Sequence, residues 1–138
     1  MNNIRPNALV IIKKNDYVLA EKGVDLKINK TFYRLMGGGI EFGELSSGTI
    51  KREMLEELGL EIINEKFLCS TENIFEYNSK KYHELTFLYK AELLDKSAYE
   101  KEIIKRIDGE SNYSEWVSIS EIKKGSIIFY PEKSIKYL

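Results

Sequence analysis

Residues 38–60 read GGIEFGELSSGTIKREMLEELGL, and this stretch says more about the 138-residue chain than any other part of it. Three of its carboxylates, Glu53, Glu56 and Glu57, lie at offsets of three and four positions. On a helix with about 100° between successive residues, such positions share one face. Like charges this close repel one another unless a cation lies between them. The stretch therefore predicts an acidic helical face that holds a cation.

The cations that best suit this face are Mg²⁺ and Mn²⁺. Hard divalent cations take oxygen ligands and commonly share their coordination shell with substrate phosphates. The opposite side of the same helix carries Met54, Leu55 and Leu58, which predict an apolar stripe packed against a sheet. We therefore expect a metal-binding face on one side of the helix and packing of the opposite side against the core.

Both ends of this helix carry recognisable signals. Ser46 and Ser47 can accept hydrogen bonds from the free N–H groups of a first helical turn, and Gly59 suits a left-handed C-terminal cap. Before the helix, glycines 37–39 permit positive φ and a close approach of the backbone to a ligand. The sequence predicts a glycine loop followed by a helix that begins near Ser46 and ends at Gly59.

The offsets in this stretch resemble the complete signature box of the Nudix hydrolases. The box reads Gly38, five residues, Glu44, seven residues, Arg52-Glu53, the aliphatic position Met54, one residue, Glu56-Glu57, one residue, Gly59 and Leu60. Glu41 and the preceding glycines also resemble the family's lead-in, and one departure is Met36, where many relatives have proline. A solvated charged helix is the weaker interpretation, because isolated acidic faces are common and the full string of offsets is not.

The resemblance implies an α+β fold, an α/β/α sandwich with a mixed, mostly antiparallel sheet between helices. It also implies hydrolysis of a nucleoside diphosphate linked to another group, by attack of water on phosphorus with Mg²⁺ or Mn²⁺ as cofactor. The length suits a single domain over residues 1–138. The intact set of box glutamates favours an enzyme. The alternative left open is a non-catalytic Nudix-fold module that binds a nucleotide and regulates.

By the same resemblance, the box residues take separate roles in the reaction. Glu53, Glu56 and Glu57 are the expected metal ligands, and the carbonyl of Gly38 is expected to complete the set. Glu53 is the first choice of general base, with Glu56 beside it in the catalytic set. The family also uses carboxylates from elsewhere in the chain, and the candidates here are Glu84, Glu100 and Glu102.

Glu44 and Arg52 are expected to pair and to hold the helix and the glycine segment in register, which makes them part of the catalytic set. The alternative is a surface ion pair of little consequence. The expected substrate contacts are Gly37, Gly38, Gly39 and Glu84. A further set of aromatic residues either stacks on a nucleobase or packs as cross-strand pairs. These are Phe32, Phe75, Tyr77 and Tyr82.

Apolar runs outside the box predict most of the remaining elements. Residues 8–12 and 17–20 flank turn-forming residues and predict a hairpin, and residues 65–77 and 81–93 predict a longer antiparallel one. Further expectations are strands at 32–35, 40–42 and 116–119, a loop or short helix over the site at 95–110, a small helix from 120, and a last one from Pro131.

Composition limits the class of partner. The chain has 21 basic and 22 acidic residues, so no basic excess favours a nucleic-acid surface, and a cap-processing or 5′-end-processing role lacks the basic groove it needs. Cys69 is the only cysteine, which fits a reducing cytoplasm. The N-terminal apolar run is too short for a signal peptide or a membrane span. We expect a cytoplasmic protein with a nucleotide-type small-molecule partner, no membrane partner, and a homodimer as an open possibility.

Substrate identity is the least determined feature. Signatures of the NADH-cleaving, ADP-ribose-cleaving and coenzyme A-cleaving members are absent, and Tyr77 lies at about the distance from the box that marks dinucleoside-polyphosphate hydrolases. We favour nucleoside triphosphates or related nucleotides, including damaged nucleotides of the cellular pool.

Overall fold

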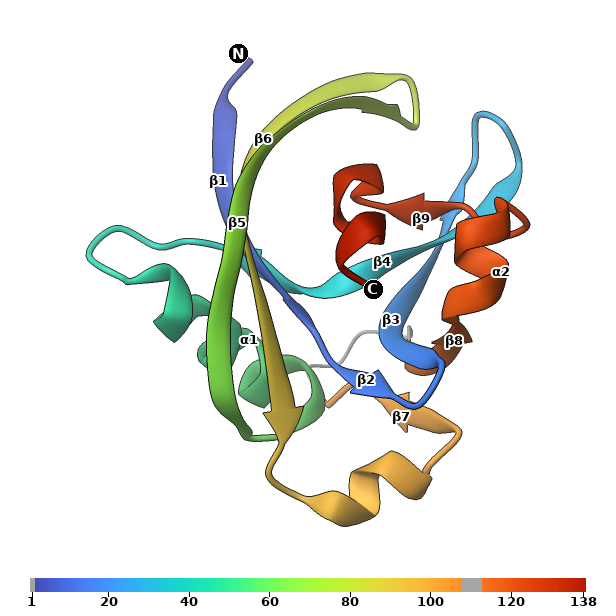
Figure 1. The fold of residues 1–138 in the computed structure, drawn as a ribbon. Helices are drawn as coiled ribbons and strands as arrows, with labels where there is room; N and C mark the ends of the chain where they lie inside the picture. The colour runs from blue at the N-terminus through green and yellow to red at the C-terminus, as the bar shows by residue number, and fades with distance from the viewer. Residues whose placement is uncertain (1, 108–112) are drawn as a thin grey trace.

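The computed structural model describes residues 2–107 and 113–138, which form a mixed sheet with helices on both faces (Figure 1). Within these residues the sheet has nine strands in the order β5-β6-β1-β4-β3-β8-β7, with β2 paired to β3 and β9 to β4. The pairs β1–β6 and β4–β9 are parallel, whereas the other described pairs are antiparallel. The expected mixed, mostly antiparallel sheet is confirmed.

The strands are β1 Ile4–Ile11, β2 Lys13–Lys14, β3 Tyr17–Asp25, β4 Lys30–Gly39, β5 Ile62–Tyr77, β6 Lys80–Leu93, β7 Ile103–Lys105, β8 Tyr113–Ser118 and β9 Phe129–Tyr130. The helices are α1 Ser46–Leu58 and α2 Ile119–Lys124, with 3-10 helices η1 Lys96–Glu100 and η2 Glu132–Tyr137. Within the described residues, no helix combines the length and the apolar character needed to cross a lipid bilayer.

Two apolar clusters hold the layers together, one on each face of the sheet. Val10 of β1 packs with Met54 of α1 on the first face. On the second face, the neighbouring Leu9 packs with Ile122 of α2, and residues of η2 cover the same cluster. Because successive strand residues point to opposite faces, the uninterrupted apolar run of β1 is buried on both sides. The α/β/α arrangement is thereby confirmed.

The first expected hairpin is confirmed only around its turn, where β2 pairs with β3 and the Leu19 N–H donates to the Ile12 carbonyl at 2.9 Å. The rest of its first arm, β1, lies between β6 and β4 instead. As a central strand, β1 pairs along both edges, with β4 antiparallel and with β6 parallel, and β6 lies far along the chain. The second hairpin is confirmed as β5–β6, which curves over the C-terminal segment in Figure 1.

The glycine run and the start of the helix also differ from expectation. Glycines 37–39 end β4 rather than forming a loop, and residues 40–42 are not a strand. α1 begins at Ser46, but its N-cap is Leu45, without a side-chain hydrogen bond. The Ser46 hydroxyl instead lies 2.6 Å from the Tyr89 hydroxyl. The expected left-handed cap is confirmed at Gly59, which has φ 68°.

The apolar stripe of α1 is rotated from the expected one. Met54 and Leu58 are buried as expected, whereas Leu55 is half-exposed and Ile50 is buried in its place. Ile50, Met54 and Leu58 lie four residues apart, so they form one line along the helix facing the sheet. This rotation leaves the box glutamates along the side of α1 that adjoins the end of β4.

The later elements agree with expectation, with one segment only partly described. β8, α2 and η2 lie where a strand and two small helices are predicted. Of the segment 95–110, the described part contains η1 and β7, and residues 108–110 lie outside the described residues.

Candidate active site

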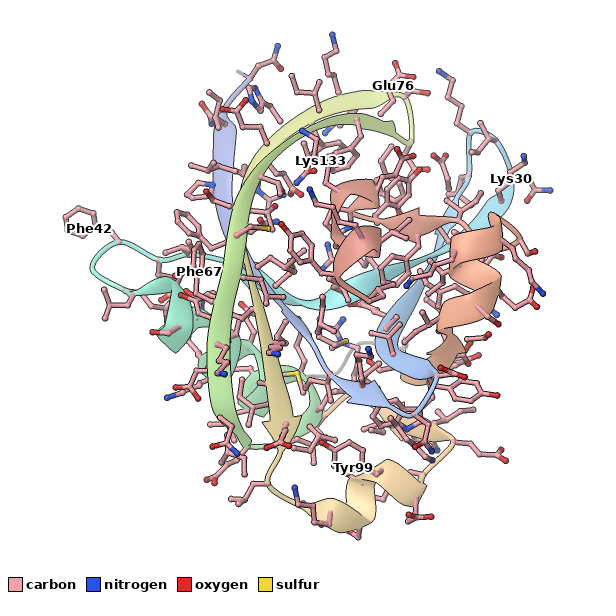
Figure 2. The ribbon with its side chains drawn as sticks, viewed as in Figure 1. Lys30, Phe42, Phe67, Glu76, Tyr99 and Lys133 are labelled. Carbon is pink, nitrogen blue, oxygen red and sulfur yellow. The ribbon has the colours of Figure 1, made fainter. Side chains whose placement is uncertain are left out.

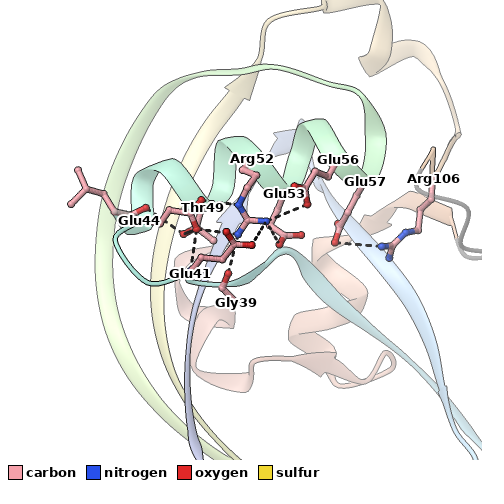
Figure 3. Close-up of polar contacts among 10 residues, drawn as sticks. Gly39, Glu41, Glu44, Thr49, Arg52, Glu53, Glu56, Glu57 and Arg106 are labelled. Atoms are coloured by element: carbon pink, nitrogen blue, oxygen red, sulfur yellow. Dashed lines mark hydrogen bonds and ion pairs between the residues drawn. The ribbon is translucent and has the colours of Figure 1, made fainter.

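Arg52 lies at the centre of the acidic face of α1 (Figure 3). Its Nε donates to Glu44 Oε2 at 2.7 Å, and its Nη2 donates to Glu44 Oε1 at 3.0 Å. Its Nη1 donates to Glu53 Oε1 at 2.9 Å and to Glu56 Oε2 at 3.2 Å. Nη2 also donates to the carbonyl of Gly39 at 3.1 Å. One guanidinium therefore ties together the end of β4, the following loop and α1.

Glu44 is held in this arrangement from several sides. Besides the bidentate contact with Arg52, Glu44 Oε1 accepts from the Thr49 hydroxyl at 2.7 Å and from the backbone N–H of Glu41 at 3.2 Å. Hydrogen bonds from Arg52 and then Thr49 lower the pKa of Glu44 to about 2. Glu44 is therefore ionised at neutral pH, and the structure brings it together with Arg52 as the sequence predicts.

Gly38 is the point where the backbone and a box carboxylate come closest. A Cβ at this position would lie 2.5 Å from Glu53 Cδ and 2.6 Å from Glu53 Oε1. The Glu53 carboxylate thus lies against the backbone of β4 in space that only glycine leaves open. Two of the predicted ligands, Gly38 and Glu53, are adjacent for this reason.

Glu57 faces a different partner. Its side chain is 9% exposed, and its Oε1 lies 3.4 Å from Arg106 Nη2. Burial raises the pKa of Glu57 to about 8, while the Arg106 charge lowers it and Glu53 and Glu21 raise it further. Its Oε2 is buried and has no hydrogen-bond partner. This carboxylate oxygen is therefore available to a ligand that brings its own positive charge.

Arg106 and Glu21 are the residues that sequence reasoning missed. Arg106 Nη1 donates to Glu21 Oε1 at 2.6 Å, and both side chains are only 10% exposed. The backbone N–H of Ile107 donates to the Glu57 carbonyl at 2.7 Å, which brings this segment onto the end of α1. No spacing or motif links Glu21 to Arg106, because their contact depends on how β3, β8 and β7 neighbour one another in the sheet.

The fit of this site to a divalent cation depends on its donors. Among residues 2–107 and 113–138, no group of acidic, histidine or cysteine side chains is already gathered in a metal-binding geometry. Arg52 holds Glu53 and Glu56, and Arg106 holds Glu57. The donor chemistry nevertheless fits Mg²⁺ or Mn²⁺, because every donor is oxygen and one is buried without a partner. Glu56 is 57% exposed, so it can turn toward a cation.

A pocket of about 680 Å³ is formed by β1, β3, β4, β5, β6 and residues 130–133. Its rings include a near-parallel stack in which Phe75 lies 5.4 Å from Tyr82 and 6.0 Å from Tyr130. The four aromatic residues left open by the sequence, Phe32, Phe75, Tyr77 and Tyr82, all line it. Glu84 also lines it, with Oε2 3.8 Å from Arg5 Nη1.

The pocket and the acidic face are joined by charged side chains. Arg34 and Glu21 both line the pocket, and Arg34 Nε lies 3.7 Å from Glu21 Oε2. Glu21 in turn binds Arg106, which reaches Glu57. The described lining of the pocket contains no residue of α1, so its connection to Glu57 runs through Glu21 and Arg106.

Two further candidates lie away from this junction. Glu100 ends η1 and Glu102 precedes β7, and both are exposed. The contact that this segment makes with Glu57 comes instead from Arg106 and Ile107.

The fold of the chain resembles those of several solved Nudix hydrolases. The structure resembles a MutT NUDIX hydrolase from Burkholderia pseudomallei, at 18% identity and TM-score 0.64 over 86% of each chain. It also resembles a NUDIX hydrolase from Nitrosomonas europaea, at 17% identity and TM-score 0.67 over 97% of this chain and 85% of the other. An ADP compounds hydrolase matches at 14% identity and TM-score 0.62 over 89% of this chain and 63% of the other. At these identities, the likeness concerns the fold.

The family model described as the NUDIX domain matches residues 3–137. The chain therefore belongs to the NUDIX family, and the Nudix resemblance of the sequence is confirmed. Through this family it is assigned as a hydrolase acting on phosphorus-containing anhydrides.

Proposed function

We propose that the chain cleaves the diphosphate linkage of a nucleoside diphosphate joined to another group, with a nucleoside triphosphate or a related nucleotide as substrate. A nucleotide-pool sanitising role belongs to the same proposal. The observation that supports it is the junction of the aromatic pocket with the carboxylates of α1 through Glu21 and Arg106. A nucleotide has a flat apolar base and a string of anionic phosphates, and the two parts of this site match those two chemistries.

The pocket is suited to the nucleoside end. Aromatic rings offer stacking surfaces to any base, and stacking contributes about 1–3 kcal/mol per base. Asn7 and Asn73 line the same pocket and belong to a hydrogen-bonded set with Thr86. The cationic side chains Arg5 and Arg34 lie along the pocket and suit phosphate oxygens.

The metal site is proposed at the acidic face, with Glu53, Glu56, Glu57 and the Gly38 carbonyl as ligands. A divalent cation bound there would neutralise the diphosphate oxygens and lower the pKa of the attacking water. Glu53 is the proposed general base, because its carboxylate lies against Gly38 and is oriented by Arg52. Arg52 and Glu44 hold this carboxylate in place relative to β4.

The proposal extends to the wider properties of the chain. We propose one domain over residues 1–138, consistent with the family match to residues 3–137. A cytoplasmic location is proposed from the single cysteine. A homodimer is proposed because β5 lies at an edge of the sheet, where backbone groups can pair with a second copy.

The proposed function is tested by measuring phosphate or diphosphate release from a panel of nucleoside triphosphates, damaged nucleotides, nucleotide sugars, ADP-ribose and dinucleoside polyphosphates. We expect turnover that requires Mg²⁺ or Mn²⁺, is lost with a chelator, and is strongest for a nucleoside triphosphate or a related nucleotide. Absence of turnover on the whole panel, with nucleotide binding retained, would instead favour the non-catalytic nucleotide-binding module.

Replacing Phe75 by alanine tests the role of the pocket. Phe75 is the middle ring of the stack, so Phe75→Ala should raise KM for the preferred nucleotide roughly ten-fold and change kcat much less. The measurement is steady-state kinetics at saturating metal. Phe67→Ala is the matched control, because Phe67, labelled in Figure 2, lies on the same strand and does not line the pocket. Equal KM values for the two variants would contradict the assignment of the pocket to the base.

A further inference from the structure

Arg106 contacts two buried carboxylates through two nitrogens of one guanidinium. Nη1 donates to Glu21 Oε1 at 2.6 Å, and Nη2 lies 3.4 Å from Glu57 Oε1. All three side chains are about nine-tenths buried. Figure 3 shows Arg106 reaching the end of the acidic face opposite to the one where Glu41 and Glu44 lie. The arrangement is therefore a fixed part of the site rather than a surface ion pair.

The two oxygens of Glu57 have different surroundings. Oε1 faces Arg106, whereas Oε2 is buried without any hydrogen-bond partner. An unpartnered buried carboxylate oxygen is costly, so the fold keeps it only where something offsets the cost. A carboxylate whose one oxygen is engaged by a guanidinium can turn little, and its other oxygen then points in one direction. Contacts of this kind orient metal ligands in many sites.

Glu21 fixes Arg106 in turn. The contact between Arg106 and Glu21 is shorter than the one between Arg106 and Glu57. Glu21 lies on β3, within the sheet, so the position of the guanidinium is set by a rigid element. Glu21 therefore sets where the guanidinium lies, and the guanidinium in turn limits how the Glu57 carboxylate can turn.

We propose that Arg106 is a positioning residue that is anchored by Glu21 and presents the unpartnered oxygen of Glu57 to the divalent cation. The inference rests on the metal site of the proposed function. It adds two residues outside the signature box to the machinery that prepares this site. It also explains why a buried arginine lies next to a proposed metal ligand, although the positive charge of the arginine by itself would repel a cation.

The test measures Mn²⁺ binding directly, from the electron paramagnetic resonance signal of free Mn²⁺, without substrate. Arg106→Gln should weaken Mn²⁺ binding by about ten-fold or more, which is the usual effect of losing a partner that orients a ligand. Arg106→Lys should restore part of the affinity, and Glu21→Gln should weaken it because the anchor loses its charge. Lys105→Gln is the matched control, since Lys105 is the exposed neighbour of Arg106 and carries the same charge.

The sign of the change separates positioning from simple charge. Removing a positive charge near a cation site should by itself strengthen Mn²⁺ binding slightly, as expected for Lys105→Gln. Weaker binding in folded Arg106→Gln therefore supports positioning. Unchanged or tighter binding overturns it, even if the melting temperature falls. If Arg106→Gln does not fold, wild-type affinity in both Arg106→Lys and Glu21→Gln overturns the inference equally. Failure of the wild-type protein to bind Mn²⁺ would instead overturn the metal site of the proposed function.

Discussion

Glu57→Gln is expected to reduce metal-dependent turnover by at least about a hundred-fold. This loss is larger than the usual effect of removing a residue that only orients a metal ligand. Glutamine keeps the shape of the side chain but replaces the buried, unpartnered carboxylate oxygen with a neutral group. The proposed cation then loses a negatively charged ligand, and no other side chain takes over the position of that oxygen. The measurement is kcat at saturating nucleotide across a series of Mg²⁺ and Mn²⁺ concentrations.

The control for this change is Glu65→Gln. Glu65 pairs with Lys51 at 2.7 Å, and Lys51 projects from the same helix as Glu57. Since partly exposed ion pairs contribute little and Glu65 lies outside the proposed site, this variant should keep near wild-type turnover. Comparable losses in both variants would show that any change of charge near α1 harms activity, which would argue against Glu57 as a ligand.

Glu57→Gln can also be tested in the metal-free protein, through the pH dependence of its stability. The pKa of Glu57 is raised from 4.5 to about 8, mainly by burial, so the folded protein keeps a proton that the unfolded chain releases. The stabilising contribution of protonated Glu57 in the metal-free wild type is therefore fully present below about pH 4.5 and is lost as the pH rises through about 8. Glu57→Gln has no proton to lose there. Its melting temperature should fall less than that of the wild type over this range.

The site divides into a part that sequence offsets can predict and a part that they cannot. Glu53, Glu56 and Glu57 share a helix, so their common face follows from helical geometry, and Gly59 ends that helix as predicted. Arg52 reaches Glu44 and Gly39 because the helix follows closely on β4. All of these contacts are local, with separations of thirteen residues or fewer.

Glu21 and Arg106 are separated by 85 residues, and the sequence around either residue does not predict their contact. Their contact depends on the sheet order β3-β8-β7, which brings the end of β7 close to β3 across the single strand β8. The same limit explains why the first hairpin is confirmed only around its turn, since the apolar run of β1 predicts burial but not which strands lie beside it. Aromatic residues at period two in β5 share a face, yet the pocket also depends on Tyr130, far along the chain.

Alanine replacements at the three consecutive glycines 37–39 should have three different outcomes. Gly37 has φ 139°, and a Cβ there would lie 2.1 Å from the backbone oxygen of Ala8. Neither β1 nor β4 can move without disturbing the core, so Gly37→Ala should cost about 3 kcal/mol or more of folding free energy. A Cβ at Gly39 would meet nothing within 4 Å, and the contact of Gly39 with Arg52 uses its backbone carbonyl, as an expected substrate contact of this glycine would use its backbone, so Gly39→Ala should behave like the wild type.

Gly38→Ala should keep the fold and lose the activity. Its Cβ would overlap the Glu53 carboxyl group at 2.5 Å, which is the far end of a flexible side chain and can move aside. A displacement of about 1 Å in a catalytic group can cost about a hundred-fold in rate, so turnover should fall by that order. The measurement is the melting temperature together with kcat for all three variants.

The pattern across the three variants carries the argument, because each glycine serves as a control for its neighbours. If Gly38→Ala lowered the melting temperature as much as Gly37→Ala, its effect on turnover would be attributed to folding. If it kept full activity, the Glu53 carboxylate would not need its place against β4, and the proposed roles of Glu53 as ligand and base would be wrong. Loss of turnover with an unchanged melting temperature, beside an active Gly39→Ala, would locate the chemistry at the contact between Gly38 and Glu53.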